Sequence, residues 1–436
     1  MGKEKPTILS GFMELLPAEQ LLFNRMFDDI RSIFELFGFS PLDTVGIERA
    51  DVLLAKGGGE TDKQVYTLTK GDARLALPFD LTVPLARYVA QNYTHLAFPF
   101  RRYHMSKVHR GERPQKGRYR EFYQCDIDII GDGTLSLVND AEIPSIIAAV
   151  FRKLGFGSFT IRINNRKILN GLFESFGIAE KSSDVLRTID KLEKIGEDNV
   201  RAELKTLELL GTVIDKVFEF IAIKGTNDKV ISQLRAMGVK NETFTTGVNE
   251  LEKVVEGIAK FGVTEDNYQI DLTIARGLDY YTGTVYETVL DDHPEIGSVC
   301  SGGRYDNLAE CYTDYKLPGV GISIGLTRLF SKLLEAGIIK PETSTTAKVL
   351  VIPLDGKFDK AMEVAAQIRE AGIPTCVYPD EVRPSKAFKY AHRIGVPFTI
   401  IIGGREAEKD TVSLKNMKSK VQEEMDVATA IRAMSA

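Results

Sequence analysis

The feature that most constrains the fold is a change in the spacing of apolar residues partway along the chain of 436 residues. From about Asn170 to Lys260, leucine and isoleucine recur at helical spacing among glutamate and lysine, as in SDVLRTIDKLEKIG and VRAELKTLELL. β-rich segments and glycines lie on both sides of this stretch. The stretch is therefore predicted to be a helical insertion into a single β-rich domain. The expected boundaries are 1–168 and 263–336 for that domain, 169–262 for the insertion, 337–346 for a linker and 347–436 for a tail domain.

Local patterns predict the elements of the β-rich domain. The segment Pro17–Phe37 repeats apolar residues at helical spacing, which predicts a long amphipathic helix, and a second helix is expected at Thr82–Gln91. Strands are expected at Gln64–Thr67, at Arg74–Pro78, in the run that ends at Tyr103, and at Glu121–Ile130. These elements predict the α+β class, with an antiparallel sheet flanked by helices.

The tail domain has a different pattern. KVLVIPL and PFTIII are continuous apolar runs suited to buried strands, and apolar residues at helical spacing lie between them. An independent α/β domain is therefore predicted. Residues 347–436 hold 14 Lys and Arg against 12 Asp and Glu, an excess that only weakly suggests contact with nucleic acid.

Composition excludes several classes of protein. No run approaches the length of a transmembrane helix and the first residues lack the apolar core of a signal peptide, so a cytoplasmic protein without a membrane partner is expected. The four cysteines form no CxxC pair, and His104 and His109 have no companions at metal-ligand spacing, so no zinc is expected. The absence of a GxxxxGK[ST] segment excludes a P-loop.

The densest basic segment runs from Arg101 to Arg120, RRYHMSKVHRGERPQKGRYR, with eight Lys and Arg and one acidic residue. A strand ending near Arg110, a turn over 111–117 and a return strand from Arg118 would form a hairpin whose arginines can bind phosphate. A solvated basic loop is the commoner explanation of such a run. The aromatic residues beside these arginines favour a functional site.

Two further segments carry glycines next to polar and aromatic residues. In IARGLDYYTGTVYET the adjacent Tyr280 and Tyr281 would face opposite sides of a strand, so that one of them could enter a pocket. GSVCSGGRYDNL would allow backbone to approach a ligand closely. A core strand with one buried tyrosine explains the first segment equally well.

Five segments together resemble the signature series of the class II histidyl-tRNA synthetases. They are LPFDLTVPLARY, KVHRGERPQKGRYREFYQCDIDIIG, RGLDYYTG, GGRYDNL and GVGISIGLTRL. Their order and spacing agree over essentially the whole chain, although the loop KGGGETD departs from the acidic form expected there. The resemblance implies a class II catalytic domain at 1–168 and 263–336, and an anticodon-binding tail at 347–436.

The resemblance also implies an activity. Such an enzyme joins L-histidine to ATP, which gives histidyl-adenylate and pyrophosphate, and then transfers histidine to the 3′ end of tRNA(His). Mg²⁺ would accompany ATP. The first long helix and the strand near Pro41 resemble the dimer-forming motif of the class, so a homodimer is expected.

By the same resemblance, six residues are assigned to ATP and seven to histidine. Arg110 matches the catalytic arginine at the α-phosphate, and Arg328 matches the arginine at the far phosphates. Arg276 matches a second catalytic arginine, which reaches either the α-phosphate or the substrate carboxylate. Those expected to complete the ATP site are Glu112, Arg118 and, against adenine, Phe122. Those expected to bind histidine are Asp80 and Thr82 at the ammonium, Gln124 and Arg276 at the carboxylate, Asp128 and Tyr281 at the imidazole, and Tyr280.

Asp128 has an alternative explanation, and two further residues are expected to contact tRNA. Asp128 could instead be a strand carboxylate paired with one of the nearby arginines. Gln115 and Lys116, at the tip of the basic hairpin, are expected to meet the acceptor end of tRNA.

A regulatory subunit of ATP phosphoribosyltransferase is the main alternative, because this synthetase-like protein senses histidine without catalysis. Such paralogues usually lack the tail domain and the ATP-binding arginines, whereas this chain has the tail together with Arg110, Arg276 and Arg328. A general RNA-binding module would leave the histidine-type segments unexplained.

Overall fold

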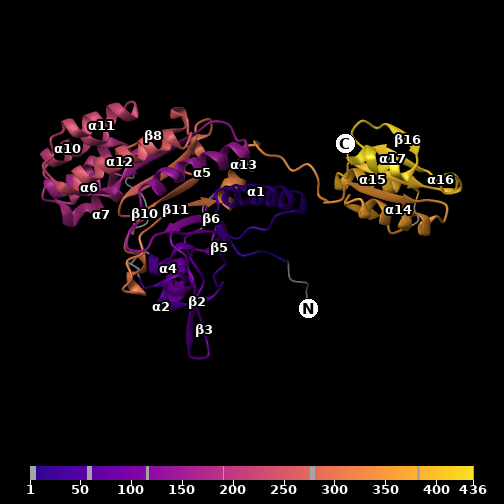
Figure 1. Ribbon diagram of the computed structural model, residues 1–436, viewed down its shortest axis with the longest axis horizontal. Coiled ribbons are helices and arrows are strands. Elements are labelled where there is room, and N and C mark those ends of the chain that lie inside the picture. Colours follow the sequence, from indigo (N-terminus) through magenta and orange to yellow (C-terminus); the bar gives the residue numbers. More distant parts are fainter. Residues whose placement is uncertain are drawn as a thin grey trace. The chain divides into compact units, whose positions relative to one another are not determined.

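The computed structural model describes residues 6–55, 61–113, 117–189, 191–274, 280–380 and 383–435 (Figure 1). The chain divides into two compact units, Met1–Met13 with Phe27–Ile338 and Glu14–Met26 with Ile339–Ala436. In the part of the chain described, no helix is both long and apolar enough to cross a membrane.

An eight-stranded sheet organises the first unit. Its strand order is β1 (Ser40–Pro41), β5 (Phe100–His109), β6 (Glu121–Ile130), β11 (Gly319–Gly325), β10 (Cys300–Tyr305), β9 (Thr284–Leu290), β7 (Phe159–Asn165) and β8 (Tyr268–Ile270). All neighbours are antiparallel except the pairs β1·β5 and β7·β8 at the two edges. Strands from before and after the helical stretch thus lie side by side in one sheet. The predicted α+β class is confirmed.

Helices flank this sheet where the apolar patterns place them. The long helix α1 (Pro17–Leu36) matches the predicted one, and α4 (Thr82–Asn92) matches the second. The helix α5 (Val138–Leu154) packs against β7, β10 and β11, and α13 (Leu326–Glu335) packs against β6. Each of these contacts covers part of the sheet that supports the site described below.

A small three-stranded sheet has the order β2 (Glu48–Arg49), β4 (Ala73–Ala76), β3 (Thr67–Lys70), and α2 (Ala50–Leu53) packs against α4 beside it. The strand expected at Gln64–Thr67 is wrong, because Gln64 ends the short helix α3 (Thr61–Gln64) and the strand begins at Thr67. In the basic hairpin, β5 ends at His109 as expected, but the return strand β6 begins at Glu121 and not at Arg118.

Between β7 and β8 the described chain is helical. The main helices are α6 (Arg166–Ser175), α7 (Ser182–Ile189), α9 (Glu197–Thr206), α10 (Gly211–Ile221), α11 (Asn227–Ala236) and α12 (Glu242–Lys260). Figure 1 shows α6, α7, α10, α11 and α12 gathered together. The helices α6 and α12 cross closely because Gly171 has no side chain, since a Cβ there would lie 2.2 Å from the backbone nitrogen of Phe244.

The second unit contains a five-stranded sheet of its own. The order is β13 (Thr375–Val377), β12 (Val349–Pro353), β14 (Phe398–Ile402), β15 (Val412–Asn416) and β16 (Gln422–Met425), parallel around β12 and antiparallel beyond β14. The helices α14 (Phe358–Glu370), α15 (Pro384–Ile394) and α17 (Val427–Ser435) contribute buried side chains to its core. The two predicted apolar runs are the central strands β12 and β14.

Candidate active site

A cleft of about 480 Å³ brings together seven of the residues predicted from sequence. Its wall is formed by the segment that follows β5, by β6, β9, β10 and β11, and by the start of α13. The predicted residues that line it are Arg110, Glu112, Arg118, Phe122, Gln124, Tyr281 and Arg328. Stretches of chain more than two hundred residues apart in sequence therefore meet at one site. A cleft of this size is typical of small-molecule sites.

The arginines of the cleft are oriented by contacts with backbone and aromatic groups. Arg110 donates from Nε to the carbonyl oxygen of Phe79 at 3.0 Å, and its guanidinium carbon lies 5.1 Å from the centre of the Phe122 ring. Arg328 donates from Nη2 to the carbonyl oxygen of Ile296 at 2.9 Å. These backbone and ring contacts orient the two guanidinium groups, and a fixed guanidinium suits an anionic ligand.

The acidic Glu112 lies near Arg118, with 3.4 Å between its Oε2 and the arginine Nη1. Both side chains are partly exposed to solvent, so this ion pair is weak and leaves both groups able to contact a ligand. A second carboxylate in the wall is Glu287 of β9, which sequence reasoning did not select.

The strand β6 forms the base of the cleft because its side chains alternate between the two faces of the sheet. Phe122 and Gln124 point to the cleft face, and Asp126 and Asp128 follow on the same face. Gln124 donates from Nε2 to Oγ of Ser323 at 2.6 Å, which links β6 to β11.

Two glycines leave room on the neighbouring strands. A Cβ at Gly321 would lie 2.3 Å from Oδ1 of Asp128, and a Cβ at Gly303 would lie 2.9 Å from Cδ1 of Tyr281. Side chains at either position would collide with residues predicted to contact histidine. The glycines therefore let the Asp128 and Tyr281 side chains pack closely against the backbone of β10 and β11. The close approach of a ligand to the segment GSVCSGGRYDNL stays a prediction.

Asp128 lies beyond the lining of the cleft. Its Oδ2 is 2.6 Å from Nη2 of Arg102, and its Oδ1 accepts a hydrogen bond of 2.7 Å from the hydroxyl of Tyr305. Both partners are buried. This geometry is the alternative considered for Asp128, a strand carboxylate paired with an arginine. Its contact with imidazole stays a prediction.

Asp80, Thr82 and Tyr280 lie in a buried cluster next to Asp128. Asp80 accepts a hydrogen bond from the backbone nitrogen of Val83 at 3.1 Å, and Thr82 is the first residue of α4. Burial raises the pKa of Asp80 to about 6, although the Val83 hydrogen bond and the charge of Arg110 oppose the shift. A partly protonated carboxyl in this position would ionise fully beside a bound cation.

The two adjacent tyrosines do not lie in a strand as expected. They belong to the segment before β9, and their ring centres are 5.0 Å apart in an edge-to-face arrangement. Tyr280 also contacts the Tyr305 ring at 5.9 Å, whereas Tyr281 reaches the cleft wall. A loop lets both rings turn toward the same buried cluster, which strand alternation would forbid.

Three predicted residues, Arg276, Gln115 and Lys116, lie outside the described residues.

Sequence reasoning missed Arg102, Asp126 and Ser323. Asp126 could have been found from its spacing, because it alternates with Gln124 and Asp128 along β6. Burial raises the pKa of Asp126 to about 7, although the charge of Arg102 and a hydrogen bond from Ser323 oppose the shift.

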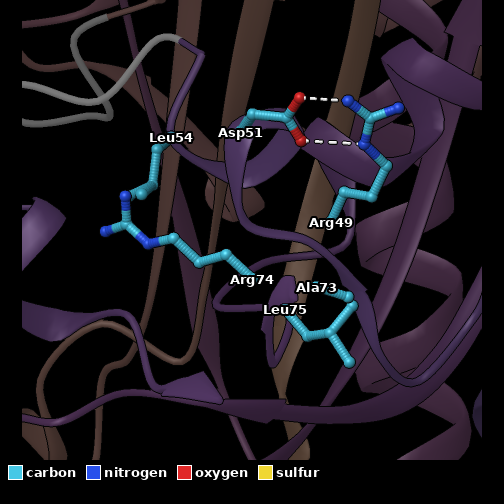
Figure 2. A pocket seen from close by; sticks show the side chains of 6 residues that line it. All are labelled: Arg49, Asp51, Leu54, Ala73, Arg74 and Leu75. Atoms are coloured by element: carbon cyan, nitrogen blue, oxygen red, sulfur yellow. Dashed lines mark hydrogen bonds and ion pairs between the residues drawn. The ribbon is translucent and has the colours of Figure 1, made fainter. Parts of the chain in front are cut away.

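A second hollow, of about 520 Å³, lies on the small sheet and α2 (Figure 2). It is lined by Arg49, Asp51, Leu54, Ala73, Arg74 and Leu75. Figure 2 shows the carboxylate of Asp51 facing the guanidinium of Arg49, with which it forms an ion pair. This hollow contains none of the residues predicted from sequence to bind ATP or histidine.

Comparisons with known proteins agree along the chain. The family model described as histidyl-tRNA synthetase matches residues 11–329, and the model described as anticodon binding domain matches residues 348–436. A histidine–tRNA ligase of Clostridium tetani is 59% identical, over 98% of this chain and 98% of its own.

Solved structures give the same result. The crystal structure of histidyl-tRNA synthetase from Nostoc sp. PCC 7120 has a TM-score of 0.92 at 42% identity and covers 99% of each chain. An ATP phosphoribosyltransferase regulatory subunit/histidyl-tRNA synthetase from Bacillus halodurans C has a TM-score of 0.75 at 23% identity, covering 92% of this chain and 98% of its own. The second likeness concerns the fold alone.

The buried carboxyl of Asp126 leads to a prediction about stability. Its pKa of about 7 in the folded protein lies above that of the unfolded chain, near 3.9. The folded state therefore keeps a proton that the unfolded state releases, and the free energy of unfolding falls as pH rises from about 4 to about 7. The substitution Asp126→Asn should raise the melting temperature, and the gain at pH 8 should exceed that at pH 5 by an amount equivalent to about 1–3 kcal/mol.

Thermal unfolding at the two pH values checks this prediction. Asp132→Asn is the matched control, because Asp132 follows β6 but is exposed, and its substitution should change little at either pH. An equal gain from Asp126→Asn at both pH values would contradict the prediction.

Proposed function

The chain belongs to the histidyl-tRNA synthetase family, and we propose on this premise that it is a histidine–tRNA ligase which forms histidyl-adenylate in the cleft over β6. The observation that supports this reaction best is the meeting of Arg110 and Arg328 in one cleft. Attack by the carboxylate of histidine on the α-phosphorus of ATP brings two anions together. Fixed cations oppose this repulsion and stabilise the charge that develops in the transition state.

We assign Arg110 to the α-phosphate and Arg328 to the far phosphates. Phe122 would pack against adenine, and its contact with the Arg110 guanidinium supports a base site next to the phosphate site. Glu112 and Arg118 would flank the nucleotide from the segment after β5. Arg276 is proposed to act on the same phosphate or on the substrate carboxylate.

Histidine would lie deeper than ATP, toward the buried carboxylates. Asp80 has one buried oxygen, Oδ2, without a hydrogen-bond partner among the described residues, and Gln124 has Oε1 in the same condition. The α-ammonium of histidine supplies donors for Asp80, beside Thr82, while Gln124 faces the carboxylate end. Tyr281 and Asp128 are proposed at the imidazole, with Tyr280 packed behind them. Unpaired groups left by a wrong amino acid would give selectivity on the order of 10⁴.

Mg²⁺ is proposed to bind together with ATP. It keeps several waters and usually needs only one or two carboxylates besides the phosphates. Glu112 and Glu287 are carboxylates in the cleft wall and fit that requirement. The described residues contain no group of three His, Cys, Asp or Glu side chains that could hold a metal by themselves. Bound Mg²⁺ would neutralise negative charge on the triphosphate. We do not propose a zinc site.

The tRNA is proposed to contact three parts of the chain. Gln115 and Lys116 would meet its acceptor end, the insertion at 169–262 its acceptor stem, and the tail at 347–436 its anticodon. Single-stranded anticodon bases can be bound by stacking and edge contacts, so a weakly basic α/β domain is sufficient. Catalysis would then be confined to 1–168 and 263–336, with 337–346 as the linker.

A homodimer in the cytoplasm is proposed as the working form. Three large apolar side chains are exposed around the end of α1 and the segment before β2, namely Leu36, Val45 and Ile47, at 76, 54 and 53%. Depletion of charge and enrichment of apolar residues are typical of the core of a homodimer interface.

The regulatory-subunit alternative is less well supported, because the tail and both described ATP-binding arginines are present.

The first prediction concerns Arg110→Ala. Loss of one preorganised charge should lower histidine-dependent ATP–pyrophosphate exchange by about 10²-fold or more. The matched control is Lys107→Ala, which removes a positive charge from β5, the strand that ends just before Arg110. Lys107 pairs with Glu121 and does not line the cleft. Exchange within a few-fold of wild type in Arg110→Ala would remove this arginine from the mechanism.

The second prediction concerns the tail. Deletion of 347–436 should reduce the charging of tRNA far more than adenylate formation, because the proposed anticodon contacts lie in the deleted part. The two rates are compared in a soluble truncated protein whose circular dichroism shows retained structure. Parallel loss of both rates would argue against a tRNA-binding tail.

The third prediction concerns assembly. Sedimentation should give twice the chain mass of 48.4 kDa, and Ile47→Glu should shift the protein toward the monomer because it places a charge in an apolar interface. Val421→Glu is the matched control, since Val421 is equally exposed at 53% but lies in the tail. A wild-type protein that sediments as a monomer would refute the proposed dimer.

A further inference from the structure

Two buried asparagines end the strand that leads into the insertion. Asn164 and Asn165 are the last residues of β7, and both are 0% exposed. Burying an amide is unfavourable unless its hydrogen bonds are made, so the partners of these side chains show what the pair does. The proposed mechanism uses neither residue. Their hydrogen bonds join the cleft wall to the insertion at 169–262.

Asn164 holds one part of the cleft wall. Its Nδ2 donates to the carbonyl oxygen of Ile274 at 3.1 Å and to that of Leu272 at 3.4 Å. Its Oδ1 accepts a hydrogen bond of 2.8 Å from the backbone nitrogen of Asn165. Ile274 lines the cleft, and Leu272 is buried beside it. The position of the Asn164 side chain therefore sets where the segment after β8 meets the cleft.

The backbone after the asparagines holds a second part of the wall. The backbone nitrogen of Arg166 donates to the carbonyl oxygen of Gly283 at 2.9 Å. Gly283 lies two residues after Tyr281, which lines the cleft, and β9 begins at the next residue and pairs with β7. The end of β7 is thus bonded to the chain next to both Ile274 and Tyr281.

Asn165 makes the contacts on the insertion side. Its Nδ2 donates to Oε2 of Glu250 in α12 at 3.0 Å, and Nζ of Lys167 lies 2.5 Å from Oε1 of the same carboxylate. Its Oδ1 accepts from the backbone nitrogen of Lys167 at 2.9 Å and so caps α6. Both oxygens of Glu250 are therefore engaged at the end of β7. Hydrogen bonds to a charged group are roughly twice as strong as neutral ones.

The helix that carries Glu250 is packed closely on the start of α6. A Cβ at Gly247 of α12 would lie 2.7 Å from the backbone nitrogen of Ile168. One at Gly171 of α6 would lie 2.2 Å from the backbone nitrogen of Phe244. Tightly packed interiors transmit displacement instead of absorbing it. A shift of α12 would accordingly act on the end of β7 through both the Glu250 carboxylate and α6.

We propose that Asn164 and Asn165 are positioning residues that couple the insertion to the cleft. A tRNA acceptor stem that binds one position of α12 better than another would act through Glu250 and the two asparagines on Ile274 and the chain beside Tyr281. Occupancy of the insertion by tRNA thereby changes the affinity of the cleft for histidine. The proposal rests on the proposed function, because it assumes that histidine occupies the cleft and that the stem contacts the insertion.

The first experiment measures KM for histidine in ATP–pyrophosphate exchange, with and without a saturating concentration of tRNA(His) that lacks its single-stranded 3′ end. This probe can neither accept histidine nor reach into the cleft, so its effect passes through the protein. KM for histidine in the wild-type protein should change by about 5-fold or more, as is typical of coupled sites. In Glu250→Ala the change should fall below about 2-fold, because the bonds between α12 and β7 are lost.

The matched control is Glu252→Ala. Glu252 lies on the same helix, but its carboxylate pairs at 2.6 Å with Arg235, which also belongs to the insertion. This variant should keep the wild-type change in KM. Glu250→Gln nearly preserves the side-chain volume and should weaken the coupling in the same direction, which keeps the test open if the alanine variant folds poorly. A merely structural role of Glu250 would lower the melting temperature and leave the ratio of the two KM values unchanged.

The second experiment tests the cleft side without tRNA. Asn164→Ala removes the hydrogen bonds to the segment after β8, so it should raise KM for histidine by about 3- to 10-fold and abolish the effect of the tRNA probe. Asn267→Ala is the matched control. The Asn267 side chain also donates to a carbonyl of β7, that of Phe159 at 3.1 Å, but at the other end of the strand. It should keep the wild-type KM and the effect of tRNA.

The outcomes separate the two proposals. Absence of histidine-dependent exchange in the wild-type protein would overturn the proposed function, and the coupling with it. An active wild-type protein whose KM for histidine ignores the bound tRNA probe would overturn the coupling alone. Coupling that persists in the Glu250 and Asn164 variants would overturn the assigned role of the two asparagines.

Discussion

The structure beneath the cleft depends on one buried guanidinium. Asp80, Asp126 and Asp128 are all nearly inaccessible to water, and burial raises the pKa of each, while the charge of Arg102, which is itself 0% exposed, opposes that rise. Burial opposes ionisation of all three, and Arg102, even with Arg110 acting on Asp80, cannot neutralise three carboxylates together. The cluster is therefore poorly balanced without a ligand. Histidine bound as proposed would supply positive charge and N–H donors to these carboxylates.

The two faces of the sheet divide the tasks of binding and support. On the cleft face, the buried glycines at 303 and 321 leave space that Tyr281 and Asp128 occupy, and the polar side chains of Gln124 and Ser323 line the cleft. The other face is held by an ion pair in which Arg304 Nη2 lies 2.5 Å from Asp140 of α5, both side chains being buried. Removing one partner of such a pair would strand a buried charge. The strands that carry the site are thus fixed from behind, which keeps the ligand-facing groups in place.

Much of the fold was predictable because it follows from periodicity. The helix α1, the strand β6 and the helical stretch after β7 all have apolar residues at the spacing of their observed elements. The errors lie where periodicity is weak, at Gln64 and in the turn before Glu121. Tyr280 and Tyr281 are predicted to lie in a strand, yet β9 begins only at Thr284 and leaves both in the preceding loop, which ends at Gly283.

The candidate site was predictable from resemblance in its outer part and less so in its inner part. Arg110, Phe122 and Arg328 belong to recognisable segments, and the cleft contains them. Arg102 lay in the same basic run, but no local pattern tells a buried arginine from an exposed one. Its burial results from pairing across β5 and β6, which is a property of register and not of composition.

The helical insertion has a simple topological origin. It leaves from the end of β7 and returns to β8, which lies parallel to β7 with Ile161 beside Tyr268. It is therefore an enlarged version of the crossover connection that any parallel pair of strands requires. Its first and last residues stay adjacent however long the insertion becomes. Added length increases only slowly the entropy that the chain loses when these two ends are brought together. The helical insertion at the sheet edge can accordingly become longer, shorter or different in sequence while the order of the central strands stays the same.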